Sequence, residues 1–306
     1  MLVAEVIVAD LIVHRRPELR RPLLIAAFAG WNDAGESATS AVRFMRRRWR
    51  EEPFAEIDPE EFYDFTQTRP RVRLEKGERV LEWPQNVFTA RQVEGAEHDI
   101  ILLEGIEPHL AWHTYVDAII ELCRSLDVAG VVTLGALLAE ASHTRPVQVN
   151  GSSADEPLQQ LFGVTTRAST YEGPTGIVGV LNQAAREAGF ATASFWGNVP
   201  YYVNATPNPK GSLALLQVLN PALGLGLTLH DLEVFAARFD AQVAAEVAKD
   251  SDVSTLARQI EARQDTESPE EEPPAVNPTA EELPDGASMV EDLERYLREH
   301  REGRSD

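Results

Sequence analysis

Three short runs of mainly apolar residues limit the fold of this 306-residue chain more than any other feature of its sequence. They cover residues 23–28, 99–104 and 130–134, and their apolar residues are consecutive rather than alternating. Strands of this kind must be covered on both faces, as in a parallel sheet between helices. An amphipathic segment at 112–126 separates the second run from the third. This order predicts a β-α-β unit with parallel pairing.

The remaining elements predict an α/β fold with a mostly parallel, mixed sheet covered on both faces. Alternating charged and apolar residues at 70–88, around a turn at 76–78, indicate a hairpin. The segment at 191–196 predicts another strand. Apolar residues at helical spacing predict helices at 36–49, 158–162, 175–188, 210–219, 232–248 and 253–263, with a break near 251–252.

The chain is expected to divide into four parts. Residues 1–230 form the α/β core domain and residues 231–264 a helical extension. Residues 265–286 are rich in Glu and Pro, which predicts a disordered acidic linker. Residues 287–306 contain a final helix at about 288–298, which either docks loosely on the chain or binds a partner. The apolar side chains on one face of that helix are Val290, Leu293, Tyr296 and Leu297.

Acidic residues concentrate at the C-terminal end of the chain. The net charge is −21, and residues 265–306 hold fourteen acidic residues and four arginines, which leaves −11 for the first 264 residues. Nucleic acids and anionic lipid surfaces attract clustered Lys and Arg. The charge therefore argues against a nucleic-acid partner and against a membrane partner.

Cysteine content and terminal composition bear on location. Cys123 is the single cysteine, so no intrachain disulfide can form, and a reducing, cytoplasmic location is expected. It lies on the apolar face of the helix predicted at 112–126, which predicts that it is a small buried hydrophobe. The N-terminus has no basic lead before Glu5, unlike a signal peptide. No apolar run approaches the roughly 20 residues that a membrane helix needs.

Several polar residues follow the predicted strands or precede a predicted helix. In open α/β sheets, ligands bind outside the carboxyl ends of the strands, so these loops are the natural place for a site. The candidate ligand or partner site comprises Asn32, Asp33, Glu107, His143, Arg145 and Thr175.

Each of these residues also has a structural interpretation. Asp33 offers a general base, but an Asp just before a helix usually caps it, and capping is the favoured interpretation. His143 and Arg145 suit anion binding or proton transfer, and they equally suit a structural loop. Thr175 lies in the Gly-Pro-Thr-Gly segment at 173–176, which is better explained as a helix start than as an anion site.

No motif completes a catalytic or metal-binding set. The segment at 173–176 matches neither the P-loop nor the dinucleotide fingerprint, and no Gly-x-Ser-x-Gly elbow is present. His109 and His113 are four residues apart, but with Glu104 and Glu107 they do not form a standard zinc set. We therefore predict no catalytic residue, no metal and no cofactor.

One strongly basic run includes Arg46, Arg47 and Arg48, at the end of the helix predicted at 36–49. Cations in the last turn of a helix complement its dipole, which is one explanation. The other is a candidate basic interaction patch for an acidic partner, including the acidic tail of this chain.

Several short motifs resemble the proteasome assembly chaperone 2 family, in their order and spacing over about residues 20–235. They are Phe28-Ala29-Gly30-Trp31-Asn32-Asp33-Ala34-Gly35, Trp83-Pro84, Glu104-Gly105-Ile106-Glu107-Pro108 with Trp112, Leu134-Gly135-Ala136-Leu137, His143-Thr144-Arg145-Pro146, Tyr171-Glu172-Gly173-Pro174-Thr175-Gly176, Trp196 with Val199-Pro200-Tyr201-Tyr202, and Asn208-Pro209.

This resemblance implies a three-layer α/β/α fold of the phosphorylase/hydrolase-like group, with C-terminal helices as in actinobacterial members. It also implies a homo-oligomer, as a trimer, and protein partners such as proteasome α-subunits. Chaperones of this type often dock through a C-terminal hydrophobic–Tyr–any tail. This chain ends in Arg304-Ser305-Asp306 and lacks that tail, which weakens the proteasome interpretation and leaves the linker and the final helix as candidates for a different contact.

Two functions therefore compete. The family resemblance and the missing catalytic set favour a non-catalytic protein-binding or assembly factor. Analogy with phosphorylases favours an enzyme or sensor for a phosphate- or nucleoside-like ligand, with the candidate residues at the strand ends as its site.

Overall fold

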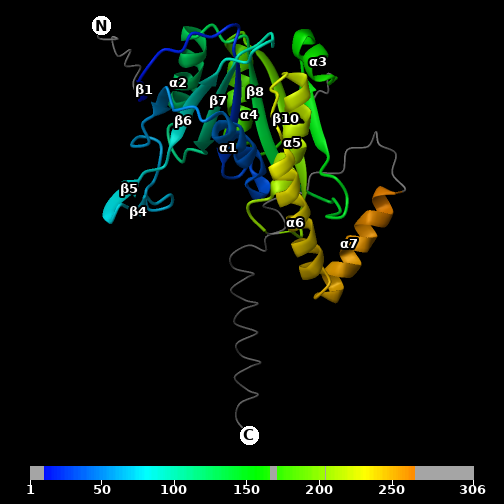
Figure 1. Ribbon diagram of the computed structural model, residues 1–306. Helices are drawn as coiled ribbons and strands as arrows, with labels where there is room; N and C mark the ends of the chain where they lie inside the picture. The colour runs from blue at the N-terminus through cyan, green and yellow to red at the C-terminus, as the bar shows by residue number, and fades with distance from the viewer. Residues whose placement is uncertain (1–9, 166–170, 204, 266–306) are drawn as a thin grey trace.

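The computed structural model describes residues 10–165, 171–203 and 205–265. Its main feature is an eight-stranded mixed sheet (Figure 1). The four central strands are parallel to one another, and antiparallel strands flank them on both sides. In spatial order the strands are β1 (Leu11–Val13), β3 (Ala55–Ile57), β6 (Asn86–Arg91), β7 (Ile100–Ile106), β2 (Leu23–Ala29), β8 (Gly130–Ala139), β10 (Ala191–Pro200) and β9 (Val149–Ser153).

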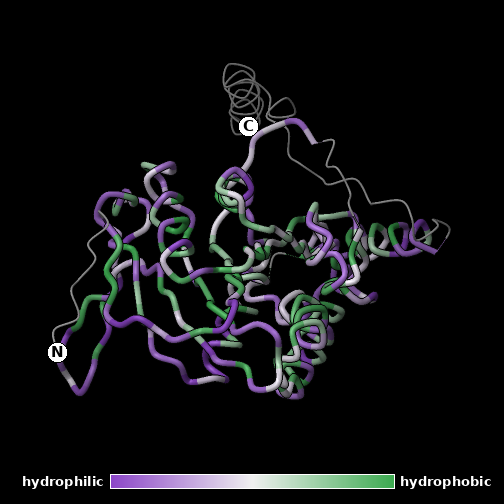
Figure 2. Tube along the Cα trace, turned by 90° about the horizontal axis from the view of Figure 1, so that it is seen from above, coloured by the Kyte–Doolittle hydropathy of each residue, from purple (hydrophilic) through white to green (hydrophobic). Residues whose placement is uncertain are grey.

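The continuous apolar runs supply both cores of a three-layer α/β/α arrangement. The covering helices are α1 (Ser37–Trp49), α2 (Trp112–Ser125), α3 (Glu156–Phe162), α4 (Ile177–Glu187) and α5 (Pro209–Ala222). In β2, Leu24 and Phe28 join the core beneath α2 and α4. Leu23 and Ile25 point the other way and join the core beneath α1 and α5. Hydrophobic and hydrophilic residues alternate along the outer helices (Figure 2).

The predicted fold class is confirmed, but the predicted pairing within the β-α-β unit is wrong. Strands β7 and β8 are parallel, yet they are not neighbours, because β2 lies between them and pairs with both. The edge strands β1 and β9 and the strands β3 and β6 were not predicted. Two of them, β1 and β3, have only three residues each, which is too short for any pattern to show.

The predicted hairpin forms a separate two-stranded sheet, β4 (Arg71–Glu75) and β5 (Glu78–Glu82). It projects from one side of the body (Figure 1). Trp83 at its base contacts Phe65 with the ring centroids 4.9 Å apart.

Two helices follow the sheet, α6 (His230–Val247) and α7 (Ser251–Gln264). The break between them lies at residues 248–250, slightly before the predicted position, because the Asp250 side chain accepts from the N–H groups of Asp252 and Val253 and starts α7. The final helix predicted at 288–298 lies outside the described residues. Within the described ranges, no helix has the length and apolar character needed to span a membrane.

Cys123 is buried in the core beneath α2, as the apolar stripe predicts. Burial raises the pKa of its thiol to about 12. A thiol with so high a pKa stays protonated near neutral pH and is a poor nucleophile.

Candidate functional site

The candidate residues separate into two groups at the carboxyl edge of the sheet. The strand-end cluster consists of Asn32 and Asp33 after β2, Glu107 after β7 and Gly176 at the start of α4. The loop cluster consists of the 142–145 loop after β8, of Tyr202, Lys210 and the end of α7, which contact it, and of Asp240 on α6, which pairs with Lys210. No described hydrogen bond or ion pair joins a strand-end carboxylate to His143 or Arg145.

Glu107 connects two chain segments through both oxygens of its carboxylate. Oε2 accepts from the backbone N–H of Trp31 at 3.2 Å, and Oε1 accepts from the backbone N–H of Ile177 at 2.9 Å. Ile177 is the first residue of α4, so the Glu107 carboxylate occupies the positive end of that helix. A free anion would have to displace this internal carboxylate.

Asn32 and Gly176 pack closely beside the Glu107 carboxylate. A Cβ atom at position 176 would lie 1.9 Å from Asn32 Oδ1 and 2.7 Å from Glu107 Oε1, so only glycine fits. Asn32 is only 8% exposed, and its backbone oxygen accepts from the N–H of Ala136 at 2.9 Å. These contacts attach the loop after β2 to β8 and to the start of α4.

Asp33 serves the start of the neighbouring helix α1. Its Oδ1 accepts from the N–H of Ala38 at 2.6 Å, and its Oδ2 accepts from the N–H of Thr39 at 3.2 Å and from the Thr39 hydroxyl. Burial raises the pKa of this carboxyl from 3.8 to about 6, although the hydrogen bonds from Thr39 and Ala38 oppose the shift. The geometry is that of a cap on α1, since both oxygens are already occupied by protein donors.

Thr175 lies just before the strand-end cluster, and its side chain is exposed. Residues 173–176 lead into α4, which begins at Ile177. The start of the helix is supplied with a negative charge by Glu107, so the observed geometry matches a helix start.

A broad depression of about 400 Å³ opens beside this cluster at the ends of β2 and β7. His109 Nδ1 accepts from the N–H of Asp64 at 3.0 Å, which leaves Nε2 to carry the proton, 3.4 Å from the Thr68 hydroxyl. Trp112 donates from Nε1 to the oxygen of Pro108 at 2.7 Å. The depression is lined by Ala29, Gly30, Gln67, Thr68, Ile106, Glu107, Pro108, His109 and Trp112.

This depression has the volume for a small molecule or for one or two side chains of a protein partner. Its polar groups can hydrogen-bond a ligand, but they do not form a metal set. Within the described ranges, no three His, Cys, Asp or Glu side chains gather closely enough to hold a metal ion.

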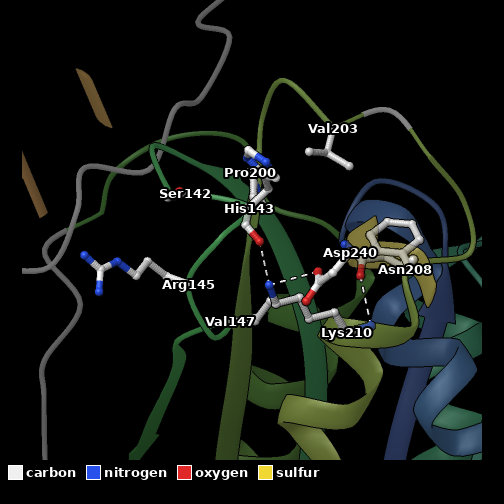
Figure 3. A pocket seen from close by; sticks show the side chains of 10 residues that line it. Ser142, His143, Arg145, Val147, Pro200, Val203, Asn208, Lys210 and Asp240 are labelled. Carbon is white, nitrogen blue, oxygen red and sulfur yellow. Dashed lines mark hydrogen bonds and ion pairs between the residues drawn. The ribbon is translucent and has the colours of Figure 1, made fainter. Parts of the chain in front are cut away.

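The loop cluster is organised around His143 and Lys210. The Tyr202 hydroxyl lies 2.9 Å from His143 Nδ1 and accepts from the His143 N–H at 2.8 Å. Lys210 Nζ donates to the His143 oxygen at 2.6 Å and pairs with Asp240 on α6 at 3.0 Å (Figure 3). Partial burial lowers the pKa of His143, and the positive charge of Lys210 lowers it further. A cavity of about 10 Å³ among these residues holds at most one water molecule.

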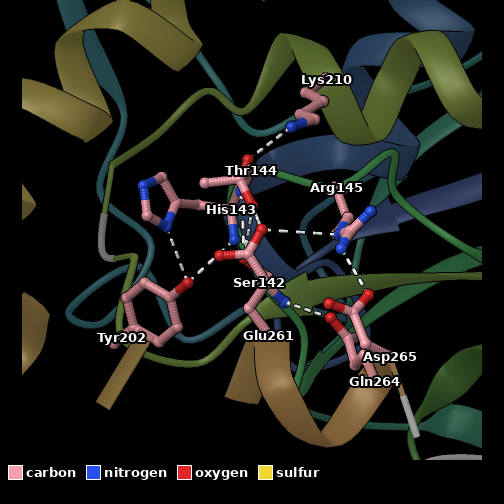
Figure 4. Close-up of polar contacts among 9 residues, drawn as sticks. All are labelled: Ser142, His143, Thr144, Arg145, Tyr202, Lys210, Glu261, Gln264 and Asp265. Carbon is pink, nitrogen blue, oxygen red and sulfur yellow. Dashed lines mark hydrogen bonds and ion pairs between the residues drawn. The ribbon is translucent and has the colours of Figure 1, made fainter. Parts of the chain in front are cut away.

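The rest of the 142–145 loop binds the last turn of α7 (Figure 4). Arg145 pairs with Asp265 and lies 3.6 Å from Glu261. The Thr144 hydroxyl donates to Glu261 at 2.8 Å, and the Ser142 N–H donates to Gln264 Oε1 at 3.1 Å. Arg145 is therefore held by α7.

The basic run on α1 is partly used within the chain. Arg46 pairs with Glu104 on β7 at 3.1 Å, and Arg48 pairs with Asp231 on α6 at 3.4 Å. Arg47 is exposed. The run thus contributes to holding α1 against the sheet and α6.

The structure brings Asn32 and Glu107 together beside Gly176, while His143 and Arg145 belong to a separate group. Sequence reasoning did not single out Lys210, Glu261 or Asp265, because their contacts span more than 60 residues of the chain. Gln67 and Thr68 were also missed, since the loop before the hairpin shows no periodic pattern.

The fold and its carboxyl edge define a three-layer α/β/α protein in which the strand-end carboxylates hold the protein's own helices. The chain belongs to the PAC2 family, whose model matches residues 27–247. No curated protein matches the chain.

Solved structures agree with this assignment. A PAC2 family protein from Streptomyces avermitilis is 39% identical, with 77% of this chain and 99% of that chain covered and a TM-score of 0.70. A proteasome-assembly chaperone homologue from Mycobacterium tuberculosis, Rv2125, is 37% identical, with 76% and 99% covered and a TM-score of 0.67. A second M. tuberculosis protein of unknown function, Rv2714, is 23% identical and shares the fold, with 84% and 91% covered and a TM-score of 0.74.

Proposed function

We propose that this chain is a non-catalytic protein-binding factor for a multi-subunit assembly, with proteasome α-subunits as the first candidate partner. The observation that carries the proposal is the use of the strand-end polar groups. Asp33 and Glu107 accept from the N–H groups of the protein's own helices, and Arg145 is held by α7. An active site keeps such groups free for a substrate, whereas a binding factor has no need to.

Relationship to the M. tuberculosis homologue supports the proposal, because that protein is described as a proteasome-assembly chaperone homologue and is 37% identical. The proposal includes self-association, as a trimer, and a cytoplasmic location, where a chain with a single cysteine needs no disulfide. The contact is expected on the folded surface or in residues 266–306.

The test is direct binding of the full-length protein to purified proteasome α-subunits from its own source. Affinity purification of the tagged chain from native lysate, with quantitative mass spectrometry, identifies the partner first. Titration calorimetry with the purified subunits then measures affinity. A chain ending at Asp265 keeps every described contact and is the matched variant for the tail. Binding at micromolar concentration or tighter supports the proposal, and no binding of either chain to α-subunits overturns the proteasome partner.

The depression beside Glu107 favours a second candidate, a sensor for a small phosphate- or nucleoside-like ligand. Its volume of about 400 Å³, its position at the strand ends and its wall at Trp112 suit a planar ring. A thermal-shift panel of nucleosides, nucleotides and inorganic phosphate tests it. A rise in melting temperature that is lost in Gln67→Ala supports this function, and an unchanged melting temperature throughout the panel counts against it.

A further inference from the structure

Two glutamates at the carboxyl end of β7 have different partners. Glu104 pairs with Arg43 at 2.7 Å and with Arg46 at 3.1 Å. Glu107, three residues later, forms no ion pair with a Lys or Arg of the described residues, and its two oxygens accept from backbone N–H groups instead. The partial positive charge at the start of α4 offsets only part of its negative charge. The Glu107 carboxylate is therefore fixed in position but lacks a cationic partner.

The depression that Glu107 lines is negative in character. Among its nine described lining residues, Glu107 is the one carboxylate and none is Lys or Arg. His109 adds no positive charge, because its Nδ1 accepts from the Asp64 N–H at 3.0 Å and a protonated imidazole has no acceptor. Gln67 donates from Nε2 to Asp64 at 3.0 Å, which leaves its Oε1 as an acceptor for a ligand. A cation that carries several N–H donors is the complement of such a lining.

Acceptor atoms are also in excess behind this lining. Asn32 Oδ1 is buried and has no hydrogen-bond partner among the described residues. A Cβ atom at Gly176 would lie 1.9 Å from this oxygen and 2.7 Å from Glu107 Oε1, so the two acceptors flank the same point. The strand-end cluster thus adds to the negative potential at Glu107 and favours a positively charged ligand over an anion.

Exposed apolar side chains beside the depression indicate that the ligand belongs to a protein. Trp31 and Leu110 are each 54% exposed. They directly follow Gly30 and His109, which line the depression. Exposed apolar groups around a polar pocket are typical of a protein interface, and Trp is among the residue types that most often dominate its binding energy. A small cation alone would leave these side chains uncovered.

We propose that the depression beside Glu107 is a binding pocket for an arginine side chain of a protein partner, with the Glu107 carboxylate as its counter-charge. Arginine fits better than lysine, because a guanidinium is planar, weakly hydrated and rich in donors, and it stacks on aromatic rings. The aromatic wall is fixed, since Trp112 Nε1 donates to the Pro108 oxygen at 2.7 Å. The inference rests on the proposed protein-binding function and names the chemistry of its contact.

The probe is Nα-acetyl-arginine amide, which reproduces an arginine within a chain. It is titrated into the full-length protein and followed by saturation-transfer NMR. A salt concentration of about 0.15 M screens the general attraction of cations to a chain of net charge −21. The expected dissociation constant is about 1 mM. The citrulline analogue, which has the same shape and no charge, should bind about tenfold more weakly, and the lysine analogue about threefold more weakly.

A surface substitution tests the site without disturbing the core. Gln67→Lys places a cation at the depression and should weaken binding of the arginine probe by about tenfold. Gln160→Lys on α3, which packs on the edge strand β9, is the matched control. Gln160 is exposed, as Gln67 is, and it likewise donates to a neighbouring carboxylate, that of Glu156 at 3.1 Å. This variant should bind the probe as wild type does. Glu107→Gln, which removes the counter-charge, should weaken binding by about tenfold.

Four outcomes overturn the inference. The first is no binding of the arginine probe at about 20 mM, and the second is equal binding to Gln67→Lys and Gln160→Lys. The third is binding only to a chain ending at Asp265, which would show that residues 266–306 fill the depression in place of a partner. The fourth is binding of adenosine but not of the arginine probe, which would favour the sensor function.

The proposed function and this inference fail separately. If proteasome α-subunits bind wild type and Gln67→Lys equally, the proposed function stands and the arginine contact is wrong. If the arginine probe binds as expected but no α-subunit binds, the pocket stands and the proteasome partner is wrong. Weaker binding of both the probe and the α-subunits to Gln67→Lys, with Gln160→Lys unchanged, supports the two together.

Discussion

The strand-end cluster and the loop cluster lie at the same edge of one sheet, yet they are held in opposite ways. In the strand-end cluster, the carboxylates of Asp33 and Glu107 accept from backbone N–H groups of α1 and α4, and Asn32 and Asp33 are buried. In the loop cluster, Arg145 is bound by carboxylates of α7, and its side chain is 47% exposed.

The difference separates position from role. The carboxyl ends of parallel strands place polar residues at this edge in both clusters, as they do in enzymes of this architecture. Burial then decides what they do. The strand-end cluster is part of the folded core, while the loop cluster attaches an added helix through solvent-exposed pairs, which contribute little to stability. Substitutions should therefore cost much in the first cluster and little in the second.

The largest expected effect is the pH dependence that Asp33 imposes. Its pKa is about 6 in the folded chain against 3.8 unfolded, so the carboxyl binds its proton more tightly when folded. Its contribution to stability is full below pH 4 and is lost as pH rises through 6, by about 3 kcal/mol in total. The free energy of unfolding of Asp33→Asn, measured by urea unfolding and compared with that of wild type, should therefore rise as the pH increases from 4 to 7.

Asp64→Asn is the control for this titration. The pKa of Asp64 is lowered to about 2, chiefly by the Thr66 hydroxyl, so its contribution is lost only as pH falls below 4. The difference between Asp64→Asn and wild type should stay constant from pH 4.5 to 7. The same pH profile for Asp33→Asn and wild type would contradict the buried state of Asp33.

Gly176→Ala should have the next largest effect. Its Cβ would lie within 2 Å of Asn32 Oδ1, so Asn32 and Glu107 must both shift. Overpacking of this kind typically costs about 1–3 kcal/mol. Gly197→Ala is the matched control, because the nearest heavy atom to its Cβ would be Val147 Cγ1 at 3.7 Å. Urea denaturation should show a larger loss in the free energy of unfolding for Gly176→Ala than for Gly197→Ala. Equal losses would contradict the steric explanation.

Glu107→Gln should cost less, about 1 kcal/mol. Gln keeps the shape and one acceptor oxygen, but it removes the charge from the start of α4 and leaves either Trp31 or Ile177 without its acceptor. Chemical denaturation at pH 7 measures the loss. A variant as stable as wild type would show that the strand-end carboxylate is not needed by the fold and is free for a ligand.

The sequence predicts the parts of this comparison that depend on local pattern. The continuous runs at 23–28 and 130–134 give β2 and β8, and an Asp just before a helix gives the cap at Asp33. Long-range partners have no such signal: Glu107 meets Ile177 70 residues later, and Thr144 meets Glu261 117 residues later. The strand order also has no local signal. The predicted pairing of β7 with β8 is wrong because β2, from an earlier part of the chain, lies between them.

The hairpin shows a further limit. Alternation at 70–88 predicts two strands, but alternation alone does not say whether the apolar face meets the core or faces outward. The extent of burial depends on where the loop at 64–68 directs the hairpin, and that loop has no periodic pattern. The exposure of Leu74 and Leu81 is therefore a result that only the three-dimensional structure provides.

Arg145→Ala should have the smallest effect on global stability, about 0.2–1 kcal/mol, because exposed ion pairs contribute little. Its effect should instead be local, since Arg145 binds Glu261 in the last turn of α7 and Asp265 just after the helix. Hydrogen exchange followed by mass spectrometry is expected to show faster exchange in α7 and unchanged exchange in β2 and β8. Arg124→Ala, which removes an exposed pair with Glu121 on α2, is the control. Unchanged exchange in α7 would mean that the Arg145 pairs are not needed to hold the helix, and that the contacts of Thr144 and Ser142, together with the buried Ala257 and Ile260, are sufficient.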